Sequence, residues 1–563
     1  MRRIIIALAL ILGATPASAA PPGPAPDVPA RFDGAIPSLR GATSAPEASS
    51  LLRGMRQLQE RRVPEGTILL GDPPPTKLAP GVSVTLQVVD IDGDGVEELV
   101  QIRGTITTPR LQLTDGSTGT AIWSKLMPTY QFVVRLLPDG DAQDLLVFMP
   151  GSISRYDGAT GNVLWQSGYP SGTWIGYFGV SPGSGGGDFV VGGWSVPYPQ
   201  ILELRLEFRS LIDGAVRGSL TIQGEGDFPS AAIAGDLDGD GVGDVFTFSP
   251  IYTFSAATTG LLKAVGNRGT TDLWSTPVAV EVTDHIFLID GGDISGDGRG
   301  DAVLLSEWLG IDATRVVEQI VTVVDGGGGM TAGLQPVTQV SLGLVAQSFT
   351  APGDVDGVPG RELIFSGAMY STSQGQGMVV FEAIGRNGRR WLASPGYGAS
   401  YSDFRWGWWS DAGDLDGDGV RDALALLGNA TVGVDRAVAV SQRNGSTIWQ
   451  RNGLGGRFVA PVHADADGDR ADDVASDVSG DHPTSSTTRF RFTVARGRNL
   501  APLWSHTKVV DSGYPSWSLY LNGGALRRDA GHDLIAEYVQ GGPGRHAAEV
   551  FEGATGAVRW TSP

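Results

Sequence analysis

The stretch Asp90-Ile91-Asp92-Gly93-Asp94-Gly95-Val96-Glu97-Glu98 places carboxylates at its first, third, fifth and ninth positions. Apolar segments of strand length, Ser83–Val89 and Glu98–Ile102, stand on either side of it. Glycine at the fourth and sixth positions allows the positive φ angles that a sharp turn needs. The stretch therefore predicts a tight acidic loop between two β-strands.

This acidic loop recurs along the chain. Five further copies begin at Asp236, Asp293, Asp354, Asp414 and Asp465, and degenerate copies lie near 139–144, 183–188 and 525–533. Each loop is followed by a turn of the form [DE]-G-x-T-G-x-x-x-W, complete at Asp115–Trp123, Asp157–Trp165 and Glu552–Trp560. Weaker turns follow the other loops, and the one expected after the second intact loop is Ser255–Gly260. The two signals together define nine units.

Each unit has the pattern strand, acidic loop, strand, strand, glycine turn, strand. A repeated four-stranded antiparallel unit of about this length is typical of a β-propeller blade. The sequence therefore predicts an all-β fold, a β-propeller with eight or nine blades. The tryptophan that ends each turn is expected to pack between neighbouring blades.

The N-terminal region predicts export. Residues 1–19 combine Arg2 and Arg3, the apolar run Ile4–Leu12 and small residues up to Ala19, which is the pattern of a cleaved signal peptide. Residues 20–47 predict a flexible leader rich in Ala and Pro, and 48–79 an accessory helix followed by a linker. The propeller is expected over 80–563, and the mature protein is expected to be secreted, with no transmembrane segment.

Composition excludes several classes of protein. The 563 residues include 61 acidic and 41 basic side chains, giving a formal net charge of −20. A nucleic-acid partner would need a basic face, so nucleic acid is not expected to bind. The chain has no Cys, which excludes disulfides and thiolate metal sites.

The acidic loops predict calcium sites. Carboxylates at positions 1, 3, 5 and 9 and the backbone carbonyl at position 7 can supply the oxygens that Ca²⁺ prefers over Mg²⁺ or zinc. In the first loop these are Asp90, Asp92, Asp94, Val96 and Glu98. The matching ligands elsewhere are Asp236, Asp238, Asp240, Val242, Asp244; Asp293, Ser295, Asp297, Arg299, Asp301; Asp354, Asp356, Glu362; Asp414, Asp416, Asp418, Val420, Asp422; and Asp465, Asp467, Asp469, Ala471, Asp473.

The loops differ in quality. Ser295 replaces one carboxylate in the third intact loop, and Val358 removes a ligand from the fourth. An EF-hand is excluded, because it needs flanking helices and a glutamate at position 12, where these loops have Gln101, Thr247 or similar residues. About four to six Ca²⁺ ions are expected, and the degenerate copies are expected to bind none.

The loops and the strand after each resemble the FG-GAP/VCBS repeats, also found in the propeller of integrin α subunits, over about residues 80–563. This resemblance implies an extracellular, calcium-stabilised propeller used mostly for binding or adhesion, and it carries the family's ligands onto the loop positions named above. The tryptophan turns also look like those of quinoprotein propellers. Many of those enzymes hold their cofactor against a Cys pair, which this chain lacks.

No catalytic or organic-cofactor residue is assigned. The chain has no H-E-x-x-H pair and no phosphate-binding glycine–lysine loop. The sequence therefore favours a secreted calcium-binding module for a glycan or protein ligand over an enzyme. The alternatives are a polysaccharide lyase-like enzyme, with Arg and His from several blades meeting at the hub, and a purely structural surface component.

Overall fold

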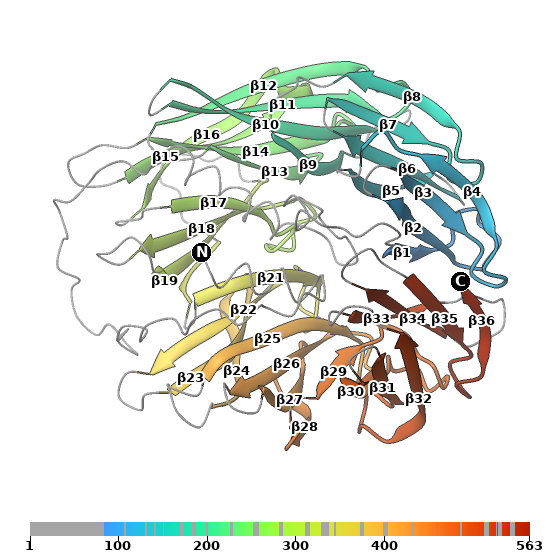
Figure 1. Ribbon diagram of the computed structural model, residues 1–563. Coiled ribbons are helices and arrows are strands. Elements are labelled where there is room, and N and C mark those ends of the chain that lie inside the picture. The colour runs from blue at the N-terminus through green and yellow to red at the C-terminus, as the bar shows by residue number, and fades with distance from the viewer. Residues whose placement is uncertain are drawn as a thin grey trace.

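A computed structural model describes residues 84–562 apart from short internal gaps such as 252–257, 310–315 and 328–336. The predicted signal peptide, leader and accessory helix lie outside the described residues. The described chain is all-β: its strands form nine four-stranded antiparallel units arranged in a ring, each made of consecutive strands (Figure 1). The fold is therefore a nine-bladed β-propeller, which decides between the eight and nine blades that the sequence left open.

The strands have the following bounds. Blades 1 to 3 contain β1 (Val84–Val89), β2 (Glu98–Thr105), β3 (Thr108–Thr114), β4 (Ala121–Leu126); β5 (Val133–Asp139), β6 (Ala142–Met149), β7 (Ser152–Tyr156), β8 (Val163–Gly168); and β9 (Trp174–Ser181), β10 (Asp188–Tyr198), β11 (Ile201–Ser210), β12 (Val216–Glu225). Blades 4 to 6 contain β13 (Ser230–Gly235), β14 (Asp244–Ile251), β15 (Thr258–Gly266), β16 (Thr271–Val280); β17 (His285–Asp290), β18 (Ala302–Leu309), β19 (Val316–Val324), β20 (Thr338–Ser341); and β21 (Val345–Gly353), β22 (Glu362–Ser371), β23 (Gln376–Gly385), β24 (Gly388–Tyr397). Blades 7 to 9 contain β25 (Phe404–Gly413), β26 (Asp422–Asn429), β27 (Gly433–Ser441), β28 (Thr447–Asn452); β29 (Phe458–Pro461), β30 (Val474–Thr484), β31 (Thr487–Ala495), β32 (Pro502–Asp511); and β33 (Trp517–Gly524), β34 (Asp533–Gln540), β35 (His546–Phe551), β36 (Val558–Ser562).

The first strand of each blade faces the centre of the ring. Contacts join β9 to β13, β13 to β17, β25 to β29 and β29 to β33. They also join β33 of blade 9 to β1 of blade 1, so the last blade meets the first. A single parallel pair, Glu225 with Ile251, links the sheets of blades 3 and 4.

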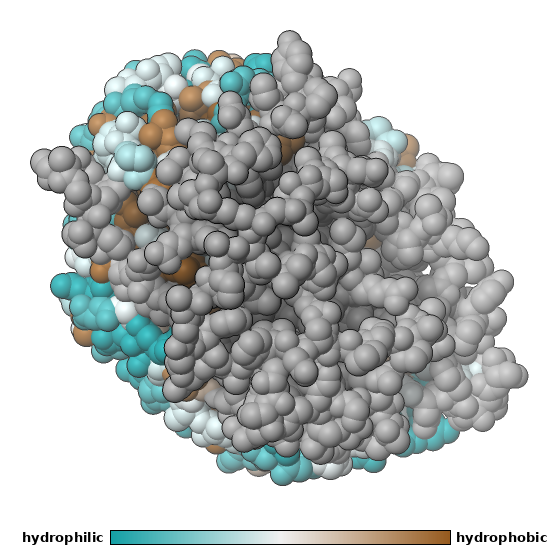
Figure 2. All heavy atoms as spheres, turned by 90° about the vertical axis from the view of Figure 1, so that its left-hand side faces the viewer, coloured by the Kyte–Doolittle hydropathy of each residue, from teal (hydrophilic) through white to brown (hydrophobic). Residues whose placement is uncertain are grey.

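The hydrophobic core is divided among the blade junctions. Nine clusters of buried side chains occur among the described residues, and each spans two neighbouring blades. The cluster of Leu99 with Leu526, Ile535 and Val550 closes the ring between blades 1 and 9. Burial of such apolar surface is the main term that stabilises the fold. Around the margin of Figure 2 the described surface is mixed, hydrophilic with scattered hydrophobic residues.

Tryptophan joins the blades as predicted. The Trp123 indole donates its Nε1–H to the Gly158 carbonyl of blade 2 at 2.7 Å. Its ring lies so close to Gly161 that an added Cβ would be 2.6 Å away, and Gly161 has φ +66°. Trp165, Trp274, Trp449, Trp504 and Trp560 make the equivalent bond to the next blade.

One predicted turn is wrong. Ser255–Gly260 was expected to be the turn of its unit, but Gly260 lies within β15 and packs against the Phe248 ring. The turn is the short 3-10 segment η1 (Asn267–Gly269), which keeps a glycine of positive φ and is followed by Trp274. The Thr-Thr-Gly sequence resembled the motif, but the real turn lacks the leading acid.

Candidate metal centres

The acidic loops all lie on one face of the ring. Each joins the first strand of a blade to the second, and the tryptophan turns join the third to the fourth; antiparallel strands alternate in direction, so both connections fall at the same end of the sheet. Neighbouring loops are tied together, because backbone N–H groups donate to carbonyls of the preceding blade in the pairs Arg361 to Asp293, Asp472 to Asp414 and His532 to Asp465.

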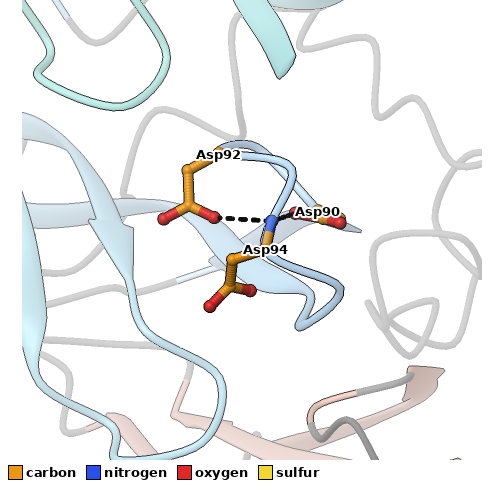
Figure 3. Close-up of side chains that lie close together, drawn as sticks. All are labelled: Asp90, Asp92 and Asp94. Atoms are coloured by element: carbon orange, nitrogen blue, oxygen red, sulfur yellow. Dashed lines mark hydrogen bonds between the residues drawn. The ribbon is translucent and has the colours of Figure 1, made fainter. Parts of the chain in front are cut away.

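The first loop shows how the backbone is held. Asp90 accepts N–H bonds from Gly93 and Asp94 on Oδ1, at 2.8 and 3.2 Å, and from Gly95 on Oδ2 at 2.9 Å. Asp92 accepts a second bond from the Asp94 N–H. The three aspartates therefore extend from one turn of chain and lie close together (Figure 3).

Five of the six intact loops bring three carboxylates together, with one oxygen of each within 4.8 Å of the others. The groups are Asp90, Asp92, Asp94; Asp236, Asp238, Asp240; Asp354, Asp356, Glu362; Asp414, Asp416, Asp422; and Asp465, Asp467, Asp473. Among the described residues the loop beginning at Asp293 forms no such group, and the Ser295 hydroxyl donates to Asp293 instead. These groups could hold metal ions; the backbone-carbonyl ligands at position 7 stay predictions.

The acid at position 9 has a second role that the sequence reasoning did not anticipate. In all six loops it is at most 3% exposed, and one oxygen accepts the backbone N–H of the second loop residue at 2.7 to 2.9 Å. That second residue, Ile91 in the first loop, is hydrophobic and buried at the blade junction. The carboxylate therefore fixes the loop to the core.

Burial makes these carboxylates hard to ionise. It raises the pKa of Asp422 to about 8 and the pKa values of Glu98 and Asp473 to about 7, and the neighbouring loop aspartates add repulsion. Asp244 and Asp301 are raised to about 6, first by burial. Among the described residues no Lys or Arg side chain forms an ion pair with any of these six position-9 acids.

The three degenerate units pair their buried acid with an arginine. Each keeps a buried acid near the start of its second strand, Asp144, Asp188 or Asp533, although its loop lacks the full set of ligand-position carboxylates. Each of these acids is paired with an arginine: Arg155 Nε at 2.6 Å, Arg268 Nε at 2.6 Å and Arg559 Nε at 3.2 Å, respectively. An acid at this place in all nine units was visible in the sequence and was the missed signal.

The residues fit a hard divalent cation. Asp244 is fully buried, and its Oδ1 has no hydrogen-bond partner among the described residues. An unpaired buried carboxylate oxygen is costly without a compensating charge. All available donors are oxygens, which is the set that Ca²⁺ takes.

Comparison with known proteins adds no argument to what the strand pairing shows. No known family matches the sequence, and no curated protein matches it. Among solved structures the chain is similar to BamB from Moraxella catarrhalis (11% identity, 77% of this chain and 100% of that one, TM-score 0.30) and to the WD40 domain of SCAP from fission yeast (10%, 78% and 93%, 0.35). It is also similar to the V. cholerae biofilm matrix protein Bap1 (14%, 81% and 84%, 0.24). No helix in the described part of the chain is long and apolar enough to cross a membrane. The strand pairing therefore assigns this chain to the β-propeller fold, and the likeness to FG-GAP/VCBS repeats stays a resemblance.

Proposed function

We propose that this protein is an exported β-propeller of the FG-GAP/VCBS type that binds Ca²⁺ in its acidic loops. In this proposal the calcium-stabilised ring is an extracellular binding or adhesion module for a glycan or protein. The metal assignment rests on how each blade balances the charge of one buried carboxylate. Three blades neutralise it with arginine, and in the six with acidic loops no arginine of the described residues does so.

The physical argument is one of charge balance. A buried carboxylate without a partner is destabilising, and removing the cation of a buried pair costs several kcal/mol. In blades 2, 3 and 9 an arginine of the chain supplies the cation, and these are the blades whose loops lack the full set of ligand-position carboxylates. The remaining blades concentrate further aspartates around the same position, which would increase repulsion unless a cation from solution is bound. Oxygen ligation selects Ca²⁺ among the common divalent ions.

Metal content and thermal unfolding test this proposal. Purified protein, dialysed against Ca²⁺ and then against metal-free buffer, is expected to retain calcium by elemental analysis. EDTA is expected to lower the Tm, since each site saturated at 100 times its Kd stabilises the folded state by about 2.7 kcal/mol. Added Ca²⁺ should restore the Tm, and Mg²⁺ at equal ionic strength should not. Protein that holds no calcium and melts identically with and without EDTA would refute the metal assignment.

The ligand-binding role needs a separate test. The support for it is that the described acidic loops and tryptophan turns lie on one face, and propeller faces of this kind offer many exposed side chains without requiring a linear motif. A glycan array and a protein pull-down, each with Ca²⁺ and with EDTA, should give a calcium-dependent signal. Release of unsaturated oligosaccharide products from a polysaccharide would identify the alternative, a lyase, instead. Detection of the mature protein outside the cell checks the predicted export.

A further inference from the structure

Two of the acidic loops form a matched pair inside one chain. The loop of blade 4, Asp236–Asp244, and the loop of blade 7, Asp414–Asp422, have the same residue at eight of nine positions. They differ only at position 8, where Gly243 corresponds to Arg421. Any difference in how these loops hold a cation must therefore come from position 8 or from the surroundings.

The surroundings of the two loops differ in whether an arginine side chain contacts a loop aspartate. In blade 7, Arg443 of the tryptophan turn donates Nε–H to Asp418 Oδ2 at 2.6 Å and Nη2–H to the Asp418 carbonyl at 2.9 Å. The strand register places Arg268 at the corresponding position of blade 4. Arg268 turns away to Asp188 of blade 3, and within the described residues no Lys or Arg pairs with the three aspartates of the blade 4 loop.

The two loops also differ in which of their carboxylates lie close together. In blade 4 the fifth-position aspartate belongs to the group of three close carboxylates, which is Asp236, Asp238 and Asp240. In blade 7 the group consists of Asp414, Asp416 and Asp422, and Asp418, which the guanidinium holds, is not part of it. The guanidinium therefore occupies one of the ligands that the cation would use.

Blades 6 and 8 also place a guanidinium on a loop acid, at the third position instead of the fifth. In blade 8, Arg496 Nε donates to Asp467 Oδ2 at 2.6 Å, and Arg498 Nη2 donates to the Asp469 carbonyl at 3.1 Å. The group of three in this blade again omits the fifth-position aspartate. In blade 6 an ion pair joins Arg390 to the third-position acid, Asp356. Three consecutive loops thus carry an arginine at a metal-ligand position.

We infer that the acidic loops fall into two affinity classes, in which the loop of blade 4 binds the cation tightly and the loops of blades 6, 7 and 8 bind it weakly. The inference rests on the proposed calcium binding. A cation entering the second class must displace a guanidinium from its carboxylate, or bind beside a positive charge that repels it. The arginines therefore set the order in which the ring fills as the calcium concentration rises.

The matched pair defines the experiment. Calcium titration by calorimetry, with native mass spectrometry to count bound ions, is carried out on the full chain and on the variants Asp238→Asn, Arg443→Gln and Arg421→Gly. Asp238→Asn should remove one ion from the tight class. Arg443→Gln should add one ion to that class, with a Kd at least about tenfold lower than the blade 7 loop has in the parent protein.

Arg421→Gly is the control, since it makes the two loop sequences identical and leaves Arg443 in place. It should leave the number of tight ions unchanged, because Arg421 pairs with Asp411, which lies outside the loop. Arg496→Gln provides an independent variant in blade 8, in case Arg443→Gln does not fold by circular dichroism.

The outcomes separate this inference from the proposed function. The two affinity classes are refuted if all calcium ions bind with one common affinity. They are also refuted if the number of tightly bound ions is unchanged in Asp238→Asn, Arg443→Gln and Arg496→Gln. Either result leaves the proposed calcium binding itself intact. A gain of a tight ion in Arg421→Gly also overturns the inference, because it would make the loop sequence decisive. Absence of bound calcium in every protein refutes the proposed function itself.

Discussion

Closure of the ring depends on a bond between the last strand and the first blade. The Trp560 indole of β36 donates its Nε1–H to the Gly116 carbonyl at 2.9 Å, and its ring lies against Gly119, where an added Cβ would be 2.7 Å away. Trp560→Phe keeps an aromatic ring for this packing and removes the donor. The lost hydrogen bond costs about 1 kcal/mol, and the carbonyl left without its partner costs about 1 kcal/mol more. We expect the variant to lose about 2 kcal/mol of unfolding free energy.

Urea denaturation followed by circular dichroism measures this loss as a lower midpoint at unchanged slope. The matched control is Trp123→Phe, which removes the same bond at the junction of blades 1 and 2, where the donor and acceptor lie 2.7 Å apart. The two variants should lose similar stability, since the structure makes the closing junction equivalent to an internal one. A normal midpoint in Trp560→Phe beside a lowered one in Trp123→Phe would show that the ring is open at this junction, and would refute the closure described here.

Three further predictions concern single contacts, all measured by the same denaturation assay. Gly161→Ala should destabilise the fold by about 1 kcal/mol or more, because φ is +66° there and the new Cβ would meet the Trp123 ring; Ala at the exposed Gly168 is the control. Burial opposes ionisation of Glu549, but hydrogen bonds from a histidine and a lysine of β32 outweigh it and hold its pKa at about 2. Its contribution of about 3 kcal/mol is therefore present above pH 4.5 and lost as the pH falls toward 2, so Glu549→Gln should differ from the parent protein at pH 7 and match it near pH 2. Arg268→Met should cost about 2 kcal/mol by leaving Asp188 without its cation, and adding Asp188→Asn should recover part of that loss, whereas additive costs would show that the pair is not coupled.

The repeat in the sequence was sufficient to predict the blades. The acidic loop and the tryptophan turn are local signals, with a fixed spacing between strands that pair within one blade, so Asp90–Glu98 and Asp115–Trp123 locate one blade without any long-range information. The same local logic failed at Ser255–Gly260, where a Thr-Thr-Gly sequence lies in a strand and the true turn has lost its acid.

The features that the sequence did not yield depend on contacts between separate segments. Glu98 was predicted only as a closing metal ligand, and the structure shows it accepting the backbone N–H of Ile91. The countercharges of the degenerate units come from different places, Arg268 from a neighbouring blade and Arg559 from the last strand. Their side-chain directions follow from packing between blades, which no spacing along the chain encodes.

The seam between blades 9 and 1 has a consequence for chain connectivity. Every blade is built from four consecutive strands, and no strand of blade 1 is needed to complete blade 9. The seam is held by a tryptophan–carbonyl bond and an apolar cluster of the same kind as the other junctions. The strand pairing therefore does not require the chain to begin at blade 1. A circular permutant that joins Ser562 to Val84 through a short linker and opens the chain between β16 and β17 should build the same ring.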